Sequence, residues 1–353
     1  MQYKLLESLR CPVSRTTLTL QVISEKLKVF DEGREMIVEE GILFSEKDWF
    51  YPIIKGIPRL CVESFLDYPD FLNKQMLDYN IKSSNIKKLH SNLLEAVIKK
   101  NKRTKESFTK EWGLFDYEKD KTWGVDGNEL VERFYLETNE NAETLKDKIV
   151  LDAGCGNGKL NHLLGKEGIQ NIGMDFSTSI EAAQFNNRSI NTHFIQGDVQ
   201  FPPVAFRHFD LIHSSGVLIA TNNTELSFSC LTPALKDTGK LSVWLYQPSK
   251  DFIHNSFNVA RNLTSKLPLS LKRILYSSAV FPLSYVIKKI KGNKQNSREM
   301  MIDILDWFTP EFRWEHKQEE VAAWFHKRSF SDVKVTQNGL FGFNIIGILN
   351  LNI

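Results

Sequence analysis

The sequence predicts an α/β protein with a mostly parallel sheet, preceded by a small β-rich unit. Residues 149–158 are an apolar run that ends in a glycine-rich turn, as expected of a strand that leads into a helix N-terminus. From residue 148 onward, short apolar runs alternate with helical patterns, which is typical of a parallel sheet. Because 353 residues are long for one domain, two units are expected.

The composition is that of an ordinary globular protein with a sizeable core, since 42% of the residues are hydrophobic and 25% are charged. A formal charge of +2 favours neither binding to nucleic acid nor its absence. Four scattered cysteines suggest no disulfide framework, and the N-terminus does not resemble a secretory signal, so a cytoplasmic location is expected. The apolar stretch 275–287 is too short to span a bilayer, and no transmembrane segment is predicted.

Residues 1–62 form the β-rich unit, with strands expected near 18–22, 42–44 and 51–54. Residues 63–105 are expected to form a helical linker, in which 81–105 is a basic amphipathic helix with eight Lys/Arg and the single acid Glu95. Such a helix binds anionic lipid or nucleic acid in some proteins. The alternative, a solvated face on a connecting helix, is favoured, and nucleic acid stays open as a partner.

Residues 106–353 contain the larger α/β unit. Helices are expected around 130–136, 226–239 and 317–326, together with a helical insertion at 248–312. Strands are expected at 149–152, 171–175, 192–195, 209–213, 241–246, 333–336 and 343–349. The last two strands would form an antiparallel hairpin that completes a seven-stranded sheet.

The spacing of the glycines indicates which nucleotide the turn holds. A dinucleotide site requires G-x-G-x-x-G, but position 159 is Lys159 and the third glycine is Gly158. Asp152, two residues before the first glycine, would repel a pyrophosphate and attract the ammonium group of S-adenosylmethionine (SAM). The turn therefore favours SAM.

Two further strands end in carboxylates that suit the same cofactor. Asp175 is placed to accept the ribose hydroxyls, and Asp198 the adenine amino group. The backbone at Ser214 and Ser215 would face the methionyl end. Aromatic residues before the first strand would close over the ligand or, equally, pack the domain edge. The full predicted set is Asp152, Ala153, Gly154, Cys155, Gly156, Gly158, Asp175, Phe176, Asp198, Val199, Ser214 and Ser215, with the aromatic residues Phe108, Trp112 and Tyr117.

These segments resemble class I SAM-dependent methyltransferases. The matching runs are 150–158, 173–177, 197–199 and 209–218, in the family's order and spacing, and the likeness extends over about 106–353. The resemblance implies a Rossmann-like seven-stranded fold and SAM as cofactor. One departure is Ile219-Ala220, where relatives often carry two histidines after G-V-L.

The N-terminal unit resembles the zinc ribbon that accompanies tRNA and release-factor methyltransferases. Cys11-Pro12-Val13-Ser14 and residues 51–60 carry this likeness. Ser14, Phe44 and Lys47 stand where the family has further cysteines, and one thiolate cannot hold a structural zinc. A metal-free ribbon with Phe44 and Trp49 filling the gap is therefore expected, in preference to a partial site of Cys11 and Cys61.

The residues that contact the methyl acceptor are expected in the insertion and just after it. Similar methyltransferases carry a D-W-x-x-P…H element there, which implies Asp306 and His316 as base or substrate contacts, with Tyr246 at the end of the fifth strand. A surface role at the helix start is the alternative for His316. Trp307, Phe308 and Phe312 would line an acceptor pocket or pin the insertion to the sheet.

The predicted function is SAM-dependent methyl transfer to an oxygen or carbon of a small-molecule acceptor, in glycan or natural-product biosynthesis. One alternative is a tRNA or protein methyltransferase, disfavoured because Ser214-Ser215-Gly216-Val217 replaces the N-P-P-Y tetrapeptide of base and amide N-methyltransferases. The other is a non-catalytic SAM-binding scaffold, disfavoured because Asp152, Asp175 and the glycines are all present.

Overall fold

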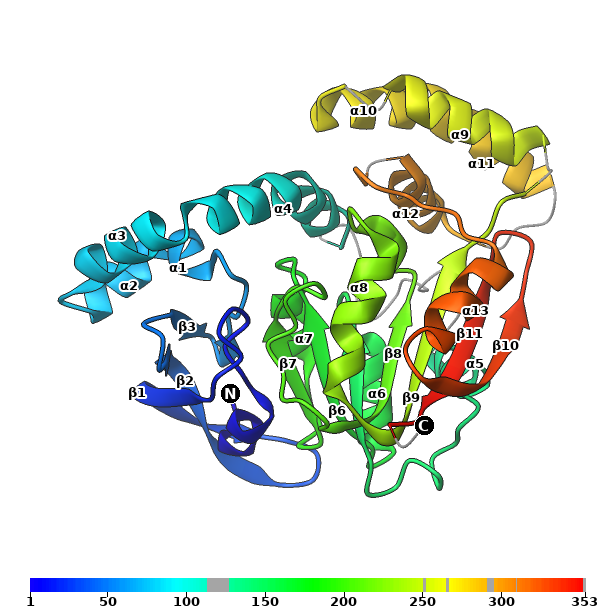
Figure 1. Cartoon of the computed structure of the whole chain (residues 1–353). Helices are drawn as coiled ribbons and strands as arrows, with labels where there is room; N and C mark the ends of the chain where they lie inside the picture. Colours follow the sequence, from blue (N-terminus) through cyan, green and yellow to red (C-terminus); the bar gives the residue numbers. More distant parts are fainter. Residues whose placement is uncertain (113–126, 250–251, 265–266, 291–294, 309, 352–353) are drawn as a thin grey trace.

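The computed structural model describes residues 1–112, 127–249, 252–264, 267–290, 295–308 and 310–351. These residues form a seven-stranded sheet and a separate four-stranded sheet, joined and covered by helices (Figure 1). The prediction of an α/β fold with a small N-terminal β unit is confirmed.

The large sheet has the order β10-β11-β9-β8-β5-β6-β7. Strands β5 to β9 are mutually parallel, whereas β11 is antiparallel to β9 and to β10, which is the predicted closing hairpin. The chain order reverses between β5 and β8, and open α/β sheets bind ligands at the carboxyl ends beside such a reversal. The strands are β5 (Ile149–Ala153), β6 (Gln170–Asp175), β7 (Thr192–Gln196), β8 (Phe209–Ser215), β9 (Leu235–Tyr246), β10 (Phe330–Asn338) and β11 (Gly342–Leu349).

The helices around this sheet are α5 (Gly127–Thr138), α6 (Lys159–Lys166), α7 (Ile180–Asn186), α8 (Thr224–Leu231) and α13 (Gln318–His326). The prediction of a helix over 226–239 was wrong at its C-terminal end. A short 3₁₀ turn at Thr232–Ala234 follows Leu231, and β9 begins at Leu235. Pro233 explains the early stop, because proline lacks the N–H that a helix interior requires.

The small sheet consists of β1 (Leu18–Val29), β2 (Arg34–Ser45), β3 (Phe50–Ile54) and β4 (Ile57–Pro58), preceded by a 3₁₀ helix at Tyr3–Ser8. Its first two strands are much longer than predicted. The extra length pairs Glu25 to Val29 with Arg34 to Val38, and much of this β1 segment is polar and exposed. A hairpin that projects into solvent carries little of the alternation that predicts a strand.

The small sheet packs against the β7 edge of the large sheet. The Leu60 amide donates to the Gln196 carbonyl at 2.7 Å, and the side chain of Arg59 is completely buried. Its guanidinium pairs with Glu181 at 2.9 Å and bonds the Gln196 side chain. Pairing here covers an edge strand that would otherwise expose unpaired backbone groups.

Residues 63–112 form four helices, α1 (Ser64–Asp67), α2 (Pro69–Gln75), α3 (Tyr79–Leu89) and α4 (Ser91–Trp112). The basic helix expected over 81–105 is therefore two helices, interrupted at His90, whose backbone leaves helical geometry (φ −124°, ψ 29°). In Figure 1, α4 runs above the carboxyl ends of β6 and β7. This course brings its C-terminal half to the edge where ligands bind.

The insertion after β9 is helical, as predicted. It contains α9 (Phe252–Thr264), α10 (Leu269–Leu275), a π-helical turn (η4, Tyr276–Val280), α11 (Phe281–Ile290) and α12 (Ser297–Phe308). Figure 1 shows α9 to α11 as a layer outside α12, beyond the carboxyl ends of β8 and β9. Within the described residues, no helix is both long and apolar enough to cross a membrane.

Candidate functional site

The glycine turn after β5 is packed too closely for side chains. Gly154, Gly156 and Gly158 have φ values of +100°, +55° and +73°, the left-handed region that favours glycine. A Cβ on Gly154 would lie 2.2 Å from Val217 Cγ2, and one on Gly158 would lie 2.6 Å from Ala183 Cβ. The turn thus brings its backbone next to the end of β8 and opens the space above it.

Asp175 at the end of β6 is held in place by its neighbours. The Gly156 amide donates to its Oδ2 at 3.0 Å, and the amide and hydroxyl of Ser177 donate to its Oδ1 at 2.8 and 2.7 Å. Burial raises the pKa of Asp175, although these hydrogen bonds act in the opposite direction. The carboxylate is oriented, and because Oδ1 already accepts two hydrogen bonds and Oδ2 one, Oδ2 retains capacity for one further donor.

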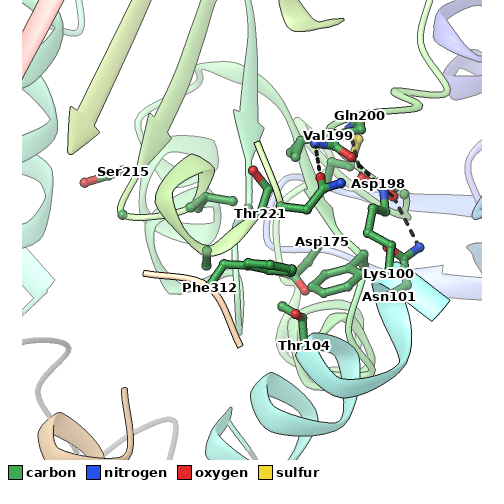
Figure 2. A pocket seen from close by; sticks show the side chains of 18 residues that line it. Lys100, Asn101, Thr104, Asp175, Asp198, Val199, Gln200, Ser215, Thr221 and Phe312 are labelled. Atoms are coloured by element: carbon green, nitrogen blue, oxygen red, sulfur yellow. Dashed lines mark hydrogen bonds and ion pairs between the residues drawn. The ribbon is translucent and has the colours of Figure 1, made fainter. Parts of the chain in front are cut away.

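A cleft of about 820 Å³, including its open mouth, lies above these carboxyl ends. Figure 2 shows Asp175, Thr104 and Phe312 around the same space, with Lys100 and Asn101 close to Asp198. The lining comes from the glycine turn, the ends of β6, β7 and β8, helix α4 and the segment after α12. Predicted cofactor residues in this lining are Gly154, Asp175, Phe176, Asp198, Val199 and Ser215.

Asp198 is bound by helix α4. Lys100 Nζ lies 2.7 Å from Asp198 Oδ2, and Asn101 Nδ2 donates to the same oxygen at 3.2 Å. Oδ1 accepts the Gln200 amide at 2.8 Å and has room for another donor. Lys100 also donates to the Gln200 side chain. At least this residue of the basic helix therefore bonds other parts of the protein and does not face solvent.

A second cavity of about 570 Å³ adjoins the first, because Gly154 and Ser215 line both. Arg133 and Glu137 of α5 also line it, as do Cys155 and Asn157 of the turn. Asp152 lies here, beside His213 of β8. Ala153 is buried within β5, and Ser214 donates to the Ala153 carbonyl at 2.8 Å, so these two predicted residues support the turn from below.

A buried charge network forms the floor of this second cavity. His213 Nε2 lies 2.7 Å from Glu137 Oε2, and His213 Nδ1 lies 3.3 Å from Asp152 Oδ1. Arg133 Nε donates to Glu137 at 2.7 Å. Burial alone would lower the pKa of His213, but its bonds to Asp152 and Glu137 raise that pKa to about 9. His213 is therefore a cation between two carboxylates at neutral pH.

This raised pKa predicts a pH-dependent stability. The unfolded histidine titrates near 6.5, so the contribution of His213 is complete below pH 6.5 and is lost as the pH rises through about 9. We expect the difference in unfolding free energy between wild type and His213→Gln to shrink by about 3 kcal/mol over this range. Urea unfolding of both proteins at pH 6.5, 8 and 9.5 measures it. A difference that does not change with pH would contradict a charged His213.

Two of the residues predicted on the acceptor side, Tyr246 and Trp307, pack against Arg313. The Arg313 guanidinium carbon lies 3.9 Å from the ring centroid of Tyr246 and 3.7 Å from that of Trp307. Its Nη1 pairs with Glu315 at 2.6 Å, whereas its buried Nε and Nη2 have no hydrogen-bond partner among the described residues. Tyr246 is thus stacked beneath a cation at the end of β9.

His316 lies at the start of α13 and uses both ring nitrogens. Nδ1 lies 2.9 Å from Glu320 Oε1, and Nε2 lies 3.0 Å from Thr224 Oγ1. It is not among the described residues that line either cavity. Asp306 lies in α12, and Phe108 and Trp112 lie in α4, but their side chains are outside the described part of the structure, as is Tyr117 entirely.

The N-terminal unit has an apolar centre where a ribbon would hold metal. The Cys11 thiol lies 3.3 Å from the Tyr51 hydroxyl, and the Ser14 amide donates to the same sulfur. Trp49 is buried against Tyr51 and Phe65. No group of three or more potential metal ligands occurs among the residues described.

Comparison with known proteins identifies the kind of domain that contains the glycine turn. Residues 145–301 match a family model described as a methyltransferase domain. This segment contains β5 to β9, with the glycine turn, Asp175 and Asp198. The chain carries a class I SAM-dependent methyltransferase domain. Its N-terminal part is a separate antiparallel β region.

Individual relatives are distant. Protein arginine N-methyltransferase 1 of Saccharomyces cerevisiae is 36% identical over 80 residues, which are 21% of this chain and 23% of that protein. Magnesium protoporphyrin IX methyltransferase of Synechocystis PCC 6803, solved with bound SAH, is 16% identical over 70% of this chain and 98% of its own, with a TM-score of 0.39. A putative O-methyltransferase of Nostoc punctiforme is 15% identical over 63% and 56%, with a TM-score of 0.38.

The lining of the two cavities contains residues that the sequence did not predict. No sequence pattern marks Glu137 and His213 as partners, because a buried ion pair between a helix and a strand depends on tertiary contact. The sequence predicted Lys100 and Asn101 only as members of a basic helix, with no role in a binding site. The missed lining residues include Lys100, Asn101, Thr104, Gln200 and Thr221 in the first cavity and Arg133, Glu137 and His213 in the second.

The Lys100–Asp198 pair predicts that α4 contributes to SAM binding. We expect Lys100→Ala to weaken SAM binding roughly tenfold, because Asp198 loses the cation that holds it in place. Lys99→Ala, one residue earlier and exposed, serves as the control. Titration calorimetry measures both dissociation constants. Equal affinities would indicate that α4 is only a linker.

Proposed function

We propose that this SAM-dependent methyltransferase methylates an oxygen or carbon of a small-molecule acceptor in glycan or natural-product biosynthesis. The observation that supports a small acceptor is the covering of the space beyond β8 and β9. The Trp314 indole donates to the Thr221 carbonyl at 2.9 Å, and the His316 amide donates to the Tyr246 carbonyl at 2.9 Å. The segment after α12 is thus tied across the strand ends, and a partly covered cleft suits a small ligand.

The residues of the two cavities fit the parts of SAM. Asp175 would accept the ribose hydroxyls, and Asp198 Oδ1 would accept the adenine amino group. Asp152 would meet the ammonium, and Arg133 supplies a positive charge for the methionyl carboxylate. When bound, SAM supplies an electrophilic methyl group on a sulfonium.

The protein's contribution to the chemistry is chiefly positioning. Holding an acceptor in line with the methyl group removes much of the entropic barrier. Tyr246, Asp306 and His316 remain our proposals for contacts with the acceptor or for its deprotonation. His316 would have to release Glu320 or Thr224 to do so. Phe312 lines the first cavity and would contact an apolar part of the acceptor.

The remaining parts of the chain have proposed roles too. We assign 1–62 as a metal-free zinc-ribbon-like domain, 63–105 as a linker whose end reaches the cofactor cleft, and 106–353 as the catalytic domain. A cytoplasmic location agrees with four free, scattered cysteines.

A protein acceptor is the second candidate, and the similarity to an arginine N-methyltransferase favours it. The partly covered acceptor side argues against it. A scaffold that binds SAM without turnover is the third possibility, and activity measurements distinguish it.

Two measurements test the proposal. Titration with SAM should show binding that is lost in Asp175→Ala and retained in Asp332→Ala, because Asp332 is exposed on β10. Release of SAH is then measured with panels of small glycans and phenolic or enolic metabolites, and with tRNA and arginine-rich peptides. No binding of SAM would overturn the proposal, and turnover only with the macromolecules would favour the alternative.

A further inference from the structure

The outer layer of the insertion, α9 to α11, exposes apolar side chains on the face opposite its own core. The exposed fractions are 64% for Leu283, 53% for Val286 and 80% for Ile290 in α11. Their spacing of three and four residues places them on one stripe of the helix. The same continuous helical segment exposes Leu271, Ile274 and Leu275 in α10, and α9 exposes Val259 and Leu263.

The opposite face of this layer is already packed. Tyr276 is buried and stacks on Phe308 of α12, with ring centroids 4.1 Å apart. Ile304, Val280 and Phe281 belong to the same apolar cluster. The helices therefore have two apolar faces, and only one of them is needed to attach the layer to the protein.

The charged residues of this segment are all basic. Residues 252–298 contain no aspartate or glutamate. They contain nine basic residues: Arg261, Lys266, Lys272, Arg273, Lys288, Lys289, Lys291, Lys294 and Arg298. Lys272 is buried and Arg261 donates to the carbonyls of Pro310 and Glu311, so these two are engaged within the protein. Over the whole chain, acids and bases nearly balance, at 43 and 45, so the imbalance is local.

We propose that the outer face of α9–α11 binds the surface of an anionic lipid bilayer. A helix that combines exposed large apolar residues with lysine and arginine lies in the interface, with its apolar side chains in the acyl region and its cations at the headgroups. Cations near such a surface are attracted to its negative charge. A second copy of this chain is a poor occupant, because two acid-free basic faces repel each other.

The position of this surface suggests what it would serve. In Figure 1 the layer lies beyond the carboxyl ends of β8 and β9, where the acceptor is proposed to bind. Helix α12, which carries the layer, also contacts α4. On the function proposed above, binding would bring the acceptor side of the cleft near the bilayer. The vesicle experiment itself needs neither SAM nor an acceptor, so its result is independent of that function.

Flotation with vesicles of phosphatidylcholine alone, or with about 30% phosphatidylglycerol, tests the proposal on the full chain. We expect at least tenfold stronger binding to the anionic vesicles, and weakening by salt. The variant Leu283→Ser/Val286→Ser/Ile290→Ser should lose at least tenfold. The control Leu27→Ser/Val29→Ser/Leu77→Ser removes exposed apolar residues elsewhere and should bind like wild type.

A second variant, Lys288→Glu/Lys289→Glu, leaves the apolar stripe intact and should also lose binding to anionic vesicles. It keeps the test decisive if the apolar variant does not fold, as judged by circular dichroism. Absence of binding, equal binding to neutral and anionic vesicles, or unchanged binding of either variant would overturn the proposal. Dimerisation that the apolar substitutions abolish, seen by light scattering, would instead identify a second copy as the occupant.

Discussion

Replacing Gly154 by alanine is expected to reduce SAM affinity by at least 100-fold. The new Cβ would lie 2.2 to 2.9 Å from three side-chain atoms of Val217, at a φ of +100° that alanine rarely adopts. Neither the steric overlap with Val217 nor the unfavourable φ can be relieved without moving the turn or the end of β8. Because both cavities share Gly154, such a movement would disturb the adenosine and methionyl ends together. Calorimetric titration with SAM measures the loss.

Gly168→Ala is the matched control. Gly168 also has a positive φ, +82°, but a Cβ there meets nothing within 4 Å. We expect a cost of about 1 kcal/mol in stability and no change in SAM affinity. Similar affinity losses in both variants would mean that backbone strain, and not contact with Val217, explains the effect.

Glu137→Ala is expected to destabilise the protein by about 3–5 kcal/mol, because breaking a buried ion pair leaves its partners uncompensated. Glu137 is 1% exposed and pairs with both His213 and Arg133. These two cations lower the pKa of Glu137 against the effect of burial. Its carboxylate is therefore charged at neutral pH and cannot be replaced by a neutral side chain without loss. Urea unfolding at pH 6.5 measures the change.

The neighbouring Glu132 lies on the same helix but is exposed, so Glu132→Ala provides the control. It should change stability by less than about 0.5 kcal/mol. In Glu137→Ala, His213 retains only Asp152, and its pKa should fall from about 9. If NMR titration shows an unchanged His213 pKa, Glu137 does not hold the charge.

The parts that the sequence predicted are those with local causes. Three glycines after an apolar run need no tertiary information, since a tight turn with positive φ demands them. Asp175 and Asp198 follow from the rule that parallel strands end at one edge. The large sheet, its closing hairpin and the helical insertion were therefore predicted, and only boundaries such as the end of α8 were wrong.

The parts that it missed depend on contacts between distant segments. Lys100 and Asp198 are 98 residues apart, and Glu137 and His213 are 76 apart. Helical periodicity identifies an amphipathic face but not the element that meets it. For the same reason, eight basic residues in 81–105 were assigned to solvent as a group, whereas Lys100 and Lys105 form ion pairs with Asp198 and Asp67.

The pairing of Lys100 with Asp198 has a kinetic consequence. The residues that hold one end of the cofactor cleft come from a helix outside the sheet, and α12 contacts that helix from the other side. If SAM occupies this cleft as proposed, movement of α4 relative to α12 would change the width of the cleft's mouth, a motion of the microsecond-to-millisecond class. We expect the dwell time of SAH on the enzyme, and not methyl transfer, to limit the turnover number.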